Sequence, residues 1–485
     1  MTNTRKKALA LGGAVAGLVT AAGAQGLVPL VPFDAVADVY VVDSTEDKLY
    51  GFADLNLDGD FADTLESFVF YDDTVGAQVL SNPTGLAVGN GARFYVADRG
   101  TGQVLRFLDG DGDRTAHDPG EAEVFFDGDP LVNQSGLTVE QPVRLLVDGG
   151  ETVWVTESNA VGGADAVLRL RDMTFDGDAN DVGEATRYYT PDPGTVAGDT
   201  VVADIDIGLD GRLYYVEAST TGFRAPGIYR LDDADASGTI DAPGEVSAFF
   251  TVPTQPNPVF LQSLASDGAG AFYLTDTGND LVWRVADLNA DGDANDVGEA
   301  SVFFTVQTSA IFWDAAPLAD GRVLVCGEDG LGELIVLEDL DASGSIGPGE
   351  ATTVFLAGGT GFLPNPRAAA WELRPMLEMP ATANIGTVGS GLLTTGASDL
   401  AFVYLSLGTM PPLTLPPFGT VLLDLSPAAA FGLFMQGTAS VGGTFPVGFT
   451  VPNAPALSGF VVHWQAAAGK VDRLLLSNLQ SLSIL

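Results

Sequence analysis

The sequence predicts an all-β protein, a six-bladed β-propeller followed by a small C-terminal β-sandwich. The first observation is a strand-loop-strand unit that recurs six times, 52 to 63 residues apart, a period that suits one four-stranded blade. The second is charge: the chain has a net charge of −43, yet residues 380–485 carry only five charged side chains. The third is that 46% of the residues are hydrophobic, enough for a large core despite the acidity.

Each repeat contains a strand of five or six mainly apolar residues that is bounded by Gly or Asp. From the second unit onward a further apolar segment precedes that strand, as GLAVG does at 85–89. The first unit lacks this segment, but NPRAAAWEL at 365–373 follows the sixth unit without a partner. We therefore expect 365–373 to supply the innermost strand of the first blade and to close a ring that spans 34–375.

The N-terminal segment is typical of an export signal. Three basic residues, Arg5 to Lys7, precede an apolar run, and Ala22-Gly23-Ala24 offers a small-x-small cleavage site. Residues 1–24 are therefore predicted to be a signal peptide, and no later segment is apolar enough to span a membrane. We expect a secreted, cell-surface or periplasmic protein.

Composition excludes several classes of function. The strong negative charge makes a nucleic-acid partner unfavourable. The only cysteine, Cys326, rules out an intrachain disulfide and a cysteine-rich zinc site. His117 and His463 are the only histidines, so catalysis by an imidazole group is not favoured. We expect His117 to be an exposed loop residue.

The segment Pro83 to Phe107, PTGLAVGNGARFYVADRGTGQVLRF, resembles an NHL repeat, and 271–285 matches it nearly as well. NHL repeats build six-bladed propellers, so the resemblance implies the same fold for 34–375 and says little about activity. The carboxylates that end the second strands belong to this repeat pattern, and we expect them to accept hydrogen bonds from turn amides. They are Asp43, Asp98, Glu157, Glu217 and Asp276.

Six acidic loops offer oxygen ligands at alternate positions, an arrangement that can wrap one hard cation. In the first loop the pattern is D-x-N-x-D-G-D-x-x-D-x-x-E, and the fifth loop repeats it. The predicted ligands, loop by loop, are Asp54, Asn56, Asp58, Asp60, Asp63 and Glu66; Asp109, Asp111, Asp113, Asp118 and Glu121; Asp172, Thr174, Asp176, Asp178, Asp181 and Glu184; Asp233, Asp235, Ser237, Asp241 and Glu245; Asp287, Asn289, Asp291, Asp293, Asp296 and Glu299; Asp339, Asp341, Ser343 and Glu350. Several Ca²⁺ ions, up to six, are the expected cofactors.

The first half of each loop resembles an EF-hand loop. In EF-hands, however, the glutamate is twelfth, whereas here it is thirteenth in five loops and twelfth only at Glu350. Strands rather than helices flank these loops, so we interpret them as calcium-binding hairpins between the third and fourth strands of each blade. The alternative is a solvated acidic turn without metal. The second loop departs from the pattern at Arg114, which replaces the loop glycine.

Binding specificity is expected on the opposite face, where long and variable segments connect the blades. The expected partner there is an unidentified protein, glycan or small molecule, and the candidate ligand-binding residues are Glu157, Glu217 and Arg224. A binding or scaffold role is favoured over catalysis. The alternative is a calcium-dependent lactonase-like hydrolase with a metal in the channel, for which Asp204 and Asp206 are further candidates.

Residues 380–485 contain alternating apolar strands separated by Gly, Pro, Ser and Thr. This pattern predicts a β-sandwich with few charges on its exterior. The low charge is compatible with a contact to the cell envelope, and equally with an ordinary appended module.

Overall fold

The computed structural model describes residues 39–371 apart from 54–59, 64–65, 90–92, 110–112, 149–150, 159–164, 192–200, 219–223, 243, 254, 256–258, 269, 306–310, 318–321, 329–331 and 357–362, and also the strands between 376 and 484. The expected signal peptide at 1–24 and the predicted ligands Asp54, Asn56, Asp58 and Asp111 lie outside the described residues. Within the described part, no helix has the length and apolarity needed to cross a membrane.

Six four-stranded antiparallel sheets form the blades of a β-propeller, as predicted. In each blade the first strand is the innermost and the fourth is the outermost. Blade 1 contains β24 (Pro366–Trp371), β1 (Val39–Asp43), β2 (Lys48–Phe52) and β3 (Ser67–Asp72). Blade 2 contains β4 (Pro83–Val88), β5 (Phe94–Asp98), β6 (Gln103–Phe107) and β7 (Ala122–Asp127). Blade 3 contains β8 (Pro142–Val147), β9 (Val153–Glu157), β10 (Ala166–Leu170) and β11 (Ala185–Tyr189).

The remaining three blades follow the same order along the chain. Blade 4 contains β12 (Val202–Ile207), β13 (Leu213–Glu217), β14 (Gly227–Leu231) and β15 (Val246–Thr251). Blade 5 contains β16 (Leu261–Ser266), β17 (Ala271–Asp276), β18 (Leu281–Ala286) and β19 (Ala300–Thr305). Blade 6 contains β20 (Ile311–Pro317), β21 (Val323–Glu328), β22 (Gly332–Leu337) and β23 (Ala351–Leu356).

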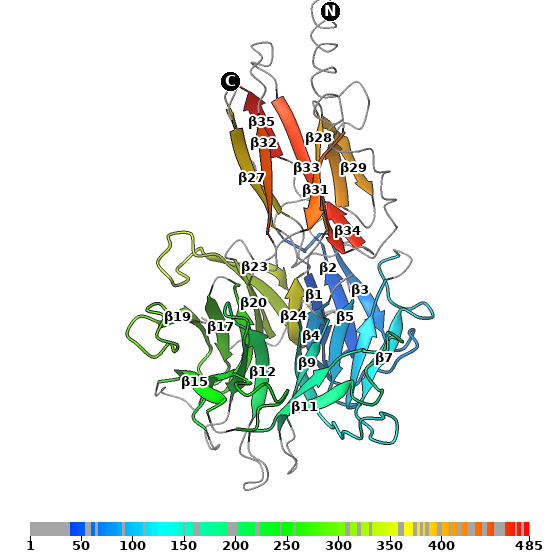
Figure 1. Ribbon diagram of the computed structural model, residues 1–485, viewed down its shortest axis with the longest axis vertical. Helices are drawn as coiled ribbons and strands as arrows, with labels where there is room; N and C mark the ends of the chain where they lie inside the picture. Colours follow the sequence, from blue (N-terminus) through cyan, green and yellow to red (C-terminus); the bar gives the residue numbers. More distant parts are fainter. Residues whose placement is uncertain are drawn as a thin grey trace, which may run out of the picture.

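Blade 1 is completed from both ends of the propeller sequence. Strand β24 pairs antiparallel with β1, with Val39 opposite Trp371 and Val42 opposite Ala368. In Figure 1, yellow β24 accordingly lies beside blue β1. The prediction that 365–373 supplies the missing innermost strand is thus confirmed, and this pairing removes an exposed edge from each of the two segments.

The hydrophobic core is divided among the joints between neighbouring blades. Between blades 1 and 2, the Tyr40 ring lies 4.0 Å from that of Phe94 and 5.1 Å from that of Phe70. Equivalent buried clusters occupy the other five joints. Because every blade buries both of its faces against neighbours, near-continuous apolar strands such as FYVAD suit this fold better than strict alternation.

In the C-terminal part, the described strands form three sheets. One contains β25 (Met376–Glu378), β27 (Val388–Thr394) and β32 (Thr444–Thr450). A larger one contains β26 (Thr382–Ala383), β35 (Gln480–Ile484), β33 (Val461–Lys470), β28 (Leu400–Ser406) and β31 (Gly432–Thr438), with β34 (Arg473–Leu476) paired to β33. The third pairs β29 (Thr409–Leu415) with β30 (Gly419–Leu423). Phe449 of β32 lies 5.7 Å from Trp464 of β33, a contact between two sheets, but the sandwich itself stays a prediction.

Candidate functional site

The acidic segments connect the third and fourth strands of every blade. In blade 3, for example, residues 172–184 link β10 to β11, and in blade 5 residues 287–299 link β18 to β19. The turns between first and second strands lie on the same face, because strands alternate in direction within an antiparallel sheet. The predicted placement of the hairpins in the blades is therefore confirmed.

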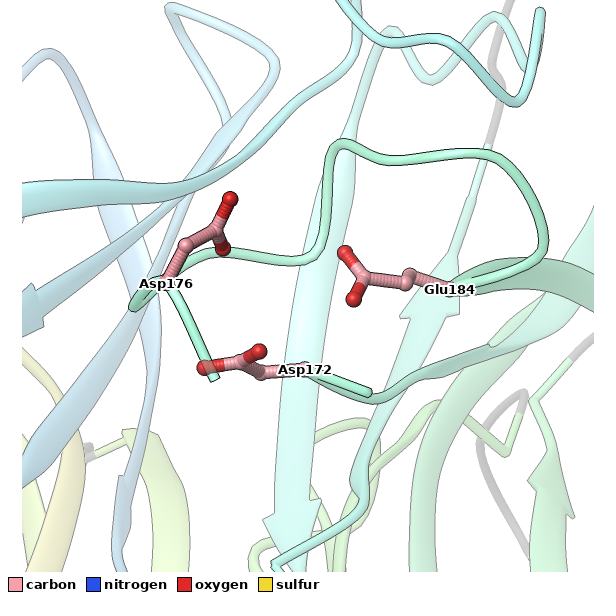
Figure 2. A group of neighbouring side chains, drawn as sticks. All are labelled: Asp172, Asp176 and Glu184. Carbon is pink, nitrogen blue, oxygen red and sulfur yellow. The ribbon is translucent and has the colours of Figure 1, made fainter. Parts of the chain in front are cut away.

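Among the described residues, three hairpins bring three carboxylates together. One oxygen from each of Asp172, Asp176 and Glu184 lies within 4.8 Å of the others, and Figure 2 shows the three groups facing a common space. Comparable groups occur in the hairpins of blades 4 and 6, with the third loop residue in place of the fifth. The equivalent groups are Asp233, Asp235 and Glu245, and Asp339, Asp341 and Glu350. In each of these loops the carboxylates of the first residue, of the third or the fifth residue, and of the last residue of the predicted pattern thus lie close together.

Backbone amides hold the first aspartate of each described hairpin. Asp172 Oδ2 accepts the N–H of Gly177 at 3.0 Å, and Asp287 Oδ2 accepts that of Gly292 at 2.9 Å. Asp233, Asp339 and Asp109 accept the equivalent N–H of the sixth loop residue. The aspartate therefore helps to fix the shape of the turn.

The last glutamate is buried in the hairpins of blades 3 and 5, where it bridges both ends of the loop. Glu184 Oε1 accepts the N–H of Met173 at 2.7 Å, and Oε2 accepts that of Asp181 at 3.2 Å. Glu299 repeats this with Leu288 and Asp296. A carboxylate oxygen has more than one lone pair, so these bonds leave acceptor capacity for a cation.

The carboxylates of these loops repel one another. Desolvation raises the pKa of Asp181, and nearby carboxylates, of which Asp176 has the largest effect, raise it further. Oxygen-rich groups without nitrogen or sulfur ligands suit a hard cation such as Ca²⁺. The other described predicted ligands are not part of a three-carboxylate group: Asp60, Asp63 and Glu66 of loop one, Thr174, Asp178 and Asp181 of loop three, Ser237 and Asp241 of loop four, Ser343 of loop six, and the members of loops two and five.

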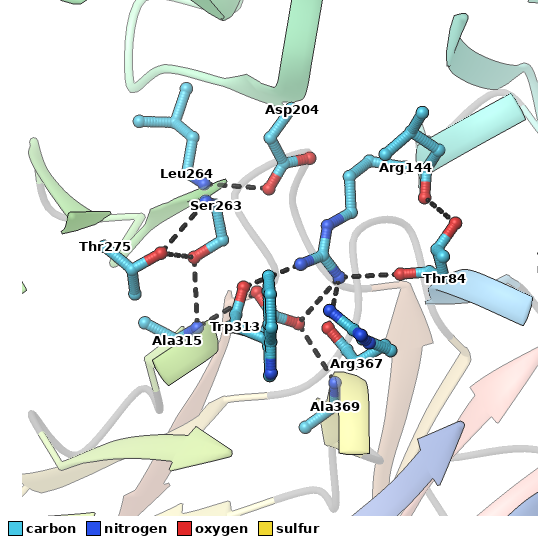
Figure 3. Close-up of polar contacts among 12 residues, drawn as sticks. Thr84, Arg144, Asp204, Ser263, Leu264, Thr275, Trp313, Ala315, Arg367 and Ala369 are labelled. Atoms are coloured by element: carbon cyan, nitrogen blue, oxygen red, sulfur yellow. Dashed lines mark hydrogen bonds and ion pairs between the residues drawn. The ribbon is translucent and has the colours of Figure 1, made fainter. Parts of the chain in front are cut away.

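A polar cluster lies where the innermost strands of several blades meet, and its members Arg144 and Asp314 were not among the predicted site residues. Arg144, on the innermost strand of blade 3, is buried and donates to three main-chain carbonyls. Its Nη1 reaches Thr84 O at 2.9 Å and Arg367 O at 2.7 Å, and its Nη2 reaches Trp313 O at 2.6 Å (Figure 3). One guanidinium thus connects blades 1, 2, 3 and 6.

Aspartates of the inner strands make similar connections. Asp204 accepts the N–H of Leu264 in the next blade at 2.8 Å, and Asp314 accepts that of Ala369 at 3.0 Å. Desolvation by burial raises the pKa of Asp204 to about 8, against the opposing effect of Arg144. Burial likewise raises the pKa of Asp314. These carboxyl groups act as inter-blade links, and the adjacent guanidinium disfavours a cation in the channel.

The other predicted ligand-binding residues lie at the ends of blade strands. Glu157 is buried, accepts the N–H of Glu140 at 3.0 Å and pairs with Arg187 at 3.1 Å. Glu217 is also buried and accepts the N–H of Val201 at 3.0 Å. Arg224 is half-buried, with its guanidinium 5.2 Å from the Tyr229 ring centre. The two glutamates therefore support the adjacent backbone, as expected for the carboxylates that end second strands.

No family model matches the chain, and no curated protein matches it. It is similar to a solved candidate 6-phosphogluconolactonase from Bacteroides uniformis, with 13% identity over 83% of this chain and 98% of that one and a TM-score of 0.40. PorZ of Porphyromonas gingivalis is 12% identical over 95% of this chain and 61% of its own, with a TM-score of 0.38. At these TM-scores we take no function from either protein.

Proposed function

We propose that this chain is an exported, calcium-binding β-propeller that acts as a binding or scaffold protein. The observation that carries the proposal is the convergence of three carboxylates at the same hairpin position in blades 3, 4 and 6. A single acidic turn would mean little, since exposed acidic groups are common without a metal. Recurrence at one position of a repeat favours a shared ligand.

Calcium would stabilise the native state in this proposal. Carboxylates collected in one loop repel each other, and a bound divalent cation would replace this repulsion with attraction. A ligand that binds only the folded chain raises its stability by mass action, by about 2.7 kcal/mol at a hundredfold excess over Kd. Such a contribution suits an exported domain with no disulfide.

The test compares thermal unfolding in calcium and in chelator for two isosteric variants. Asp172→Asn should reduce the calcium-induced rise in Tm, because it removes one charged ligand from the hairpin of blade 3. Asp129→Asn, a control in an exposed connection between blades 2 and 3, should keep the full rise. Equal rises in both variants, or no rise in the parent chain, would contradict the calcium proposal.

The channel does not favour the hydrolase alternative. Asp204 links blades 4 and 5 by accepting the N–H of Leu264, and burial raises its pKa to about 8, so near neutral pH it offers a cation little negative charge. A catalytic ion there would also lie near the Arg144 guanidinium, which carries the same sign of charge. We therefore propose that a protein, glycan or small molecule binds at the face of the inter-blade connections, with Glu157, Glu217 and Arg224 as the residues to test.

Export and the C-terminal domain complete the proposal. Cleavage after Ala24 would release a mature chain that begins at Gln25, which N-terminal sequencing of protein from the culture medium or periplasm checks directly. The contact between Phe449 and Trp464 supports a sandwich in which two sheets pack face to face. Its few charged residues make it the part that we propose for contact with the cell envelope.

A further inference from the structure

Every acidic hairpin touches the blade that precedes its own. The eighth residue of the loop donates its backbone N–H to a carbonyl on the outermost strand of that preceding blade. The six pairs are Phe61 to Val354 (2.8 Å), Ala116 to Phe70 (2.8 Å), Ala179 to Phe125 (2.7 Å), Ile240 to Tyr188 (2.7 Å), Ala294 to Phe249 (2.7 Å) and Ile346 to Phe303 (2.7 Å). The bonds run around the whole ring, including the joint from blade 6 to blade 1.

Each acceptor is the extra residue of a β-bulge. In β7, Phe126 pairs with Val104 and Val124 with Leu105, so Phe125 between them has no opposite residue. The same irregularity isolates Phe70 in β3 and Phe249 in β15. A bulge residue leaves the ladder, so its carbonyl is available to the neighbouring blade. The recurrence of the bulge at the acceptor in all six outer strands ties it to the hairpin contact.

The eighth residue also contributes its side chain to the joint. Ala116, Ala179 and Ala294 are fully buried, each in the hydrophobic cluster that contains its acceptor residue. Phe61 and Ile240 are buried in the same way, and Ile346 packs against the cluster of blades 5 and 6. The hairpins are therefore anchored in the core at an otherwise acidic, exposed rim.

Three hairpins add a second bond through the ninth residue. His117 Nε2 accepts the N–H of Asp72 at 2.9 Å, and its ring lies 5.5 Å from that of Tyr71. Asn180 and Asn295 use Oδ1 to accept the N–H of Asp127 and of Thr251, at 2.9 and 3.0 Å. His117 is thus a half-buried acceptor, and the expectation of an exposed loop residue was wrong.

We propose that the acidic hairpins are clasps, each of which holds its blade to the preceding blade through the eighth and ninth loop residues. A change in a hairpin then acts on the joint between two blades, whereas the sheet that contains the hairpin is affected less. Where the hairpin binds calcium, an extension that rests on the proposed function, the ion would strengthen that joint.

Hydrogen exchange of the full chain, with His117→Leu and His117→Asn compared, tests the clasp. Leucine removes the acceptor, so exchange in a peptide covering β3 of blade 1 should become about five- to tenfold faster, as expected for one lost hydrogen bond. Asparagine, which occupies this position in loops three and five, should keep exchange within about twofold of the parent. Peptides covering β6, in the hairpin's own blade, should change in neither variant.

Two results would overturn the proposal: unchanged exchange in β3 of His117→Leu, or a loss of protection confined to β6. If His117→Leu does not fold, Asn295→Leu and Asn295→His can be compared instead, by hydrogen exchange in a peptide covering β15 of blade 4. Repeating the measurement in calcium and chelator separates the two proposals. Hairpins that are indifferent to chelator would contradict calcium binding, while the comparison of variants would still decide the clasp.

Discussion

Arg144 shows how a single residue can hold a ring of repeats together. It lies on blade 3, yet its three hydrogen bonds end on blades 1, 2 and 6. Main-chain carbonyls accept its donors, and Asp314 lies 3.7 Å from Nη1. Buried arginine is tolerated only where its donors and charge are both matched, and Arg144 meets both conditions.

Replacing Arg144 with methionine should lower the free energy of unfolding by about 3 to 5 kcal/mol, because three carbonyls and a carboxylate lose their buried partner. Urea denaturation monitored by tryptophan fluorescence measures the change. Arg212→Met is the matched control, since the Arg212 side chain is 44% exposed and pairs only at the surface. A loss below about 1 kcal/mol would mean that water replaces the guanidinium without penalty.

The buried carboxyl of Asp204 predicts a pH dependence of stability. Burial raises its pKa to about 8 in the folded chain, whereas an unfolded aspartate has a value of about 3.9. Between these values the folded chain binds more protons than the unfolded chain, so this group's contribution to the free energy of unfolding falls as pH rises.

Asp204→Asn removes this linkage. Its urea midpoint should therefore decline less than that of the parent between about pH 5 and about pH 8, measured in chelator so that calcium occupancy does not vary. Parallel declines in the two proteins would contradict a raised pKa at Asp204.

At the scale of an element, the hairpin of blade 2 departs from the others for a structural reason. Its sixth residue is Arg114, with a φ of 74°, where the hairpins of blades 3 to 6 have a positive-φ glycine such as Gly177. In the joint between blades 2 and 3, a Cβ on Gly177 would lie 3.0 Å from Arg106 of the preceding blade. Blade 1 has Gly51 at the place of Arg106, and Arg114 instead lies over the ring of Phe68, 5.4 Å from its centre.

In one joint the arginine lies on the hairpin, as Arg114, and in the next it lies on the preceding blade, as Arg106. This difference predicts the relative stability of two variants at position 114. Arg114→Gly loses the ring contact but removes the strain of the left-handed conformation, so we expect a small net change. Arg114→Ala loses the contact and keeps the strain, and it should be less stable than Arg114→Gly by about 1 kcal/mol. Equal urea midpoints for the two variants would contradict this account of the loop.

The sequence predicted the elements better than the contacts between them. The hairpins, second strands and ring-closing segment were predictable because their apolar runs and acidic loops repeat at a regular spacing. Of the inner-strand residues, Asp204 and Asp206 were named as candidates, but Arg144 and Asp314 were missed, because inner strands contain irregularities, such as that between Pro142 and Arg144, that change which side chain faces inward. The acceptor role of His117 was also missed, since it depends on a bulge in a different blade.

In the whole molecule, contacts between blades occur at three distances from the centre of the ring. Polar side chains such as Asp314 connect blades in the channel, the hydrophobic clusters fill the joints, and the hairpins join blades at the rim. The pairing of β24 with β1 unites the two ends of the propeller sequence. Stability in this arrangement depends on neighbouring blades, so ions bound at the rim would contribute to the cohesion of the entire ring.

The measurement that tests this account most directly is the number of calcium ions per chain, by elemental analysis of protein purified in calcium and then desalted. Calcium at the repeated hairpins predicts about four to six ions. A single ion would instead indicate one special site, as a channel metal would require. A chain without calcium that stays folded in chelator would contradict the account, and the hairpins would then be acidic turns held by their own backbone hydrogen bonds.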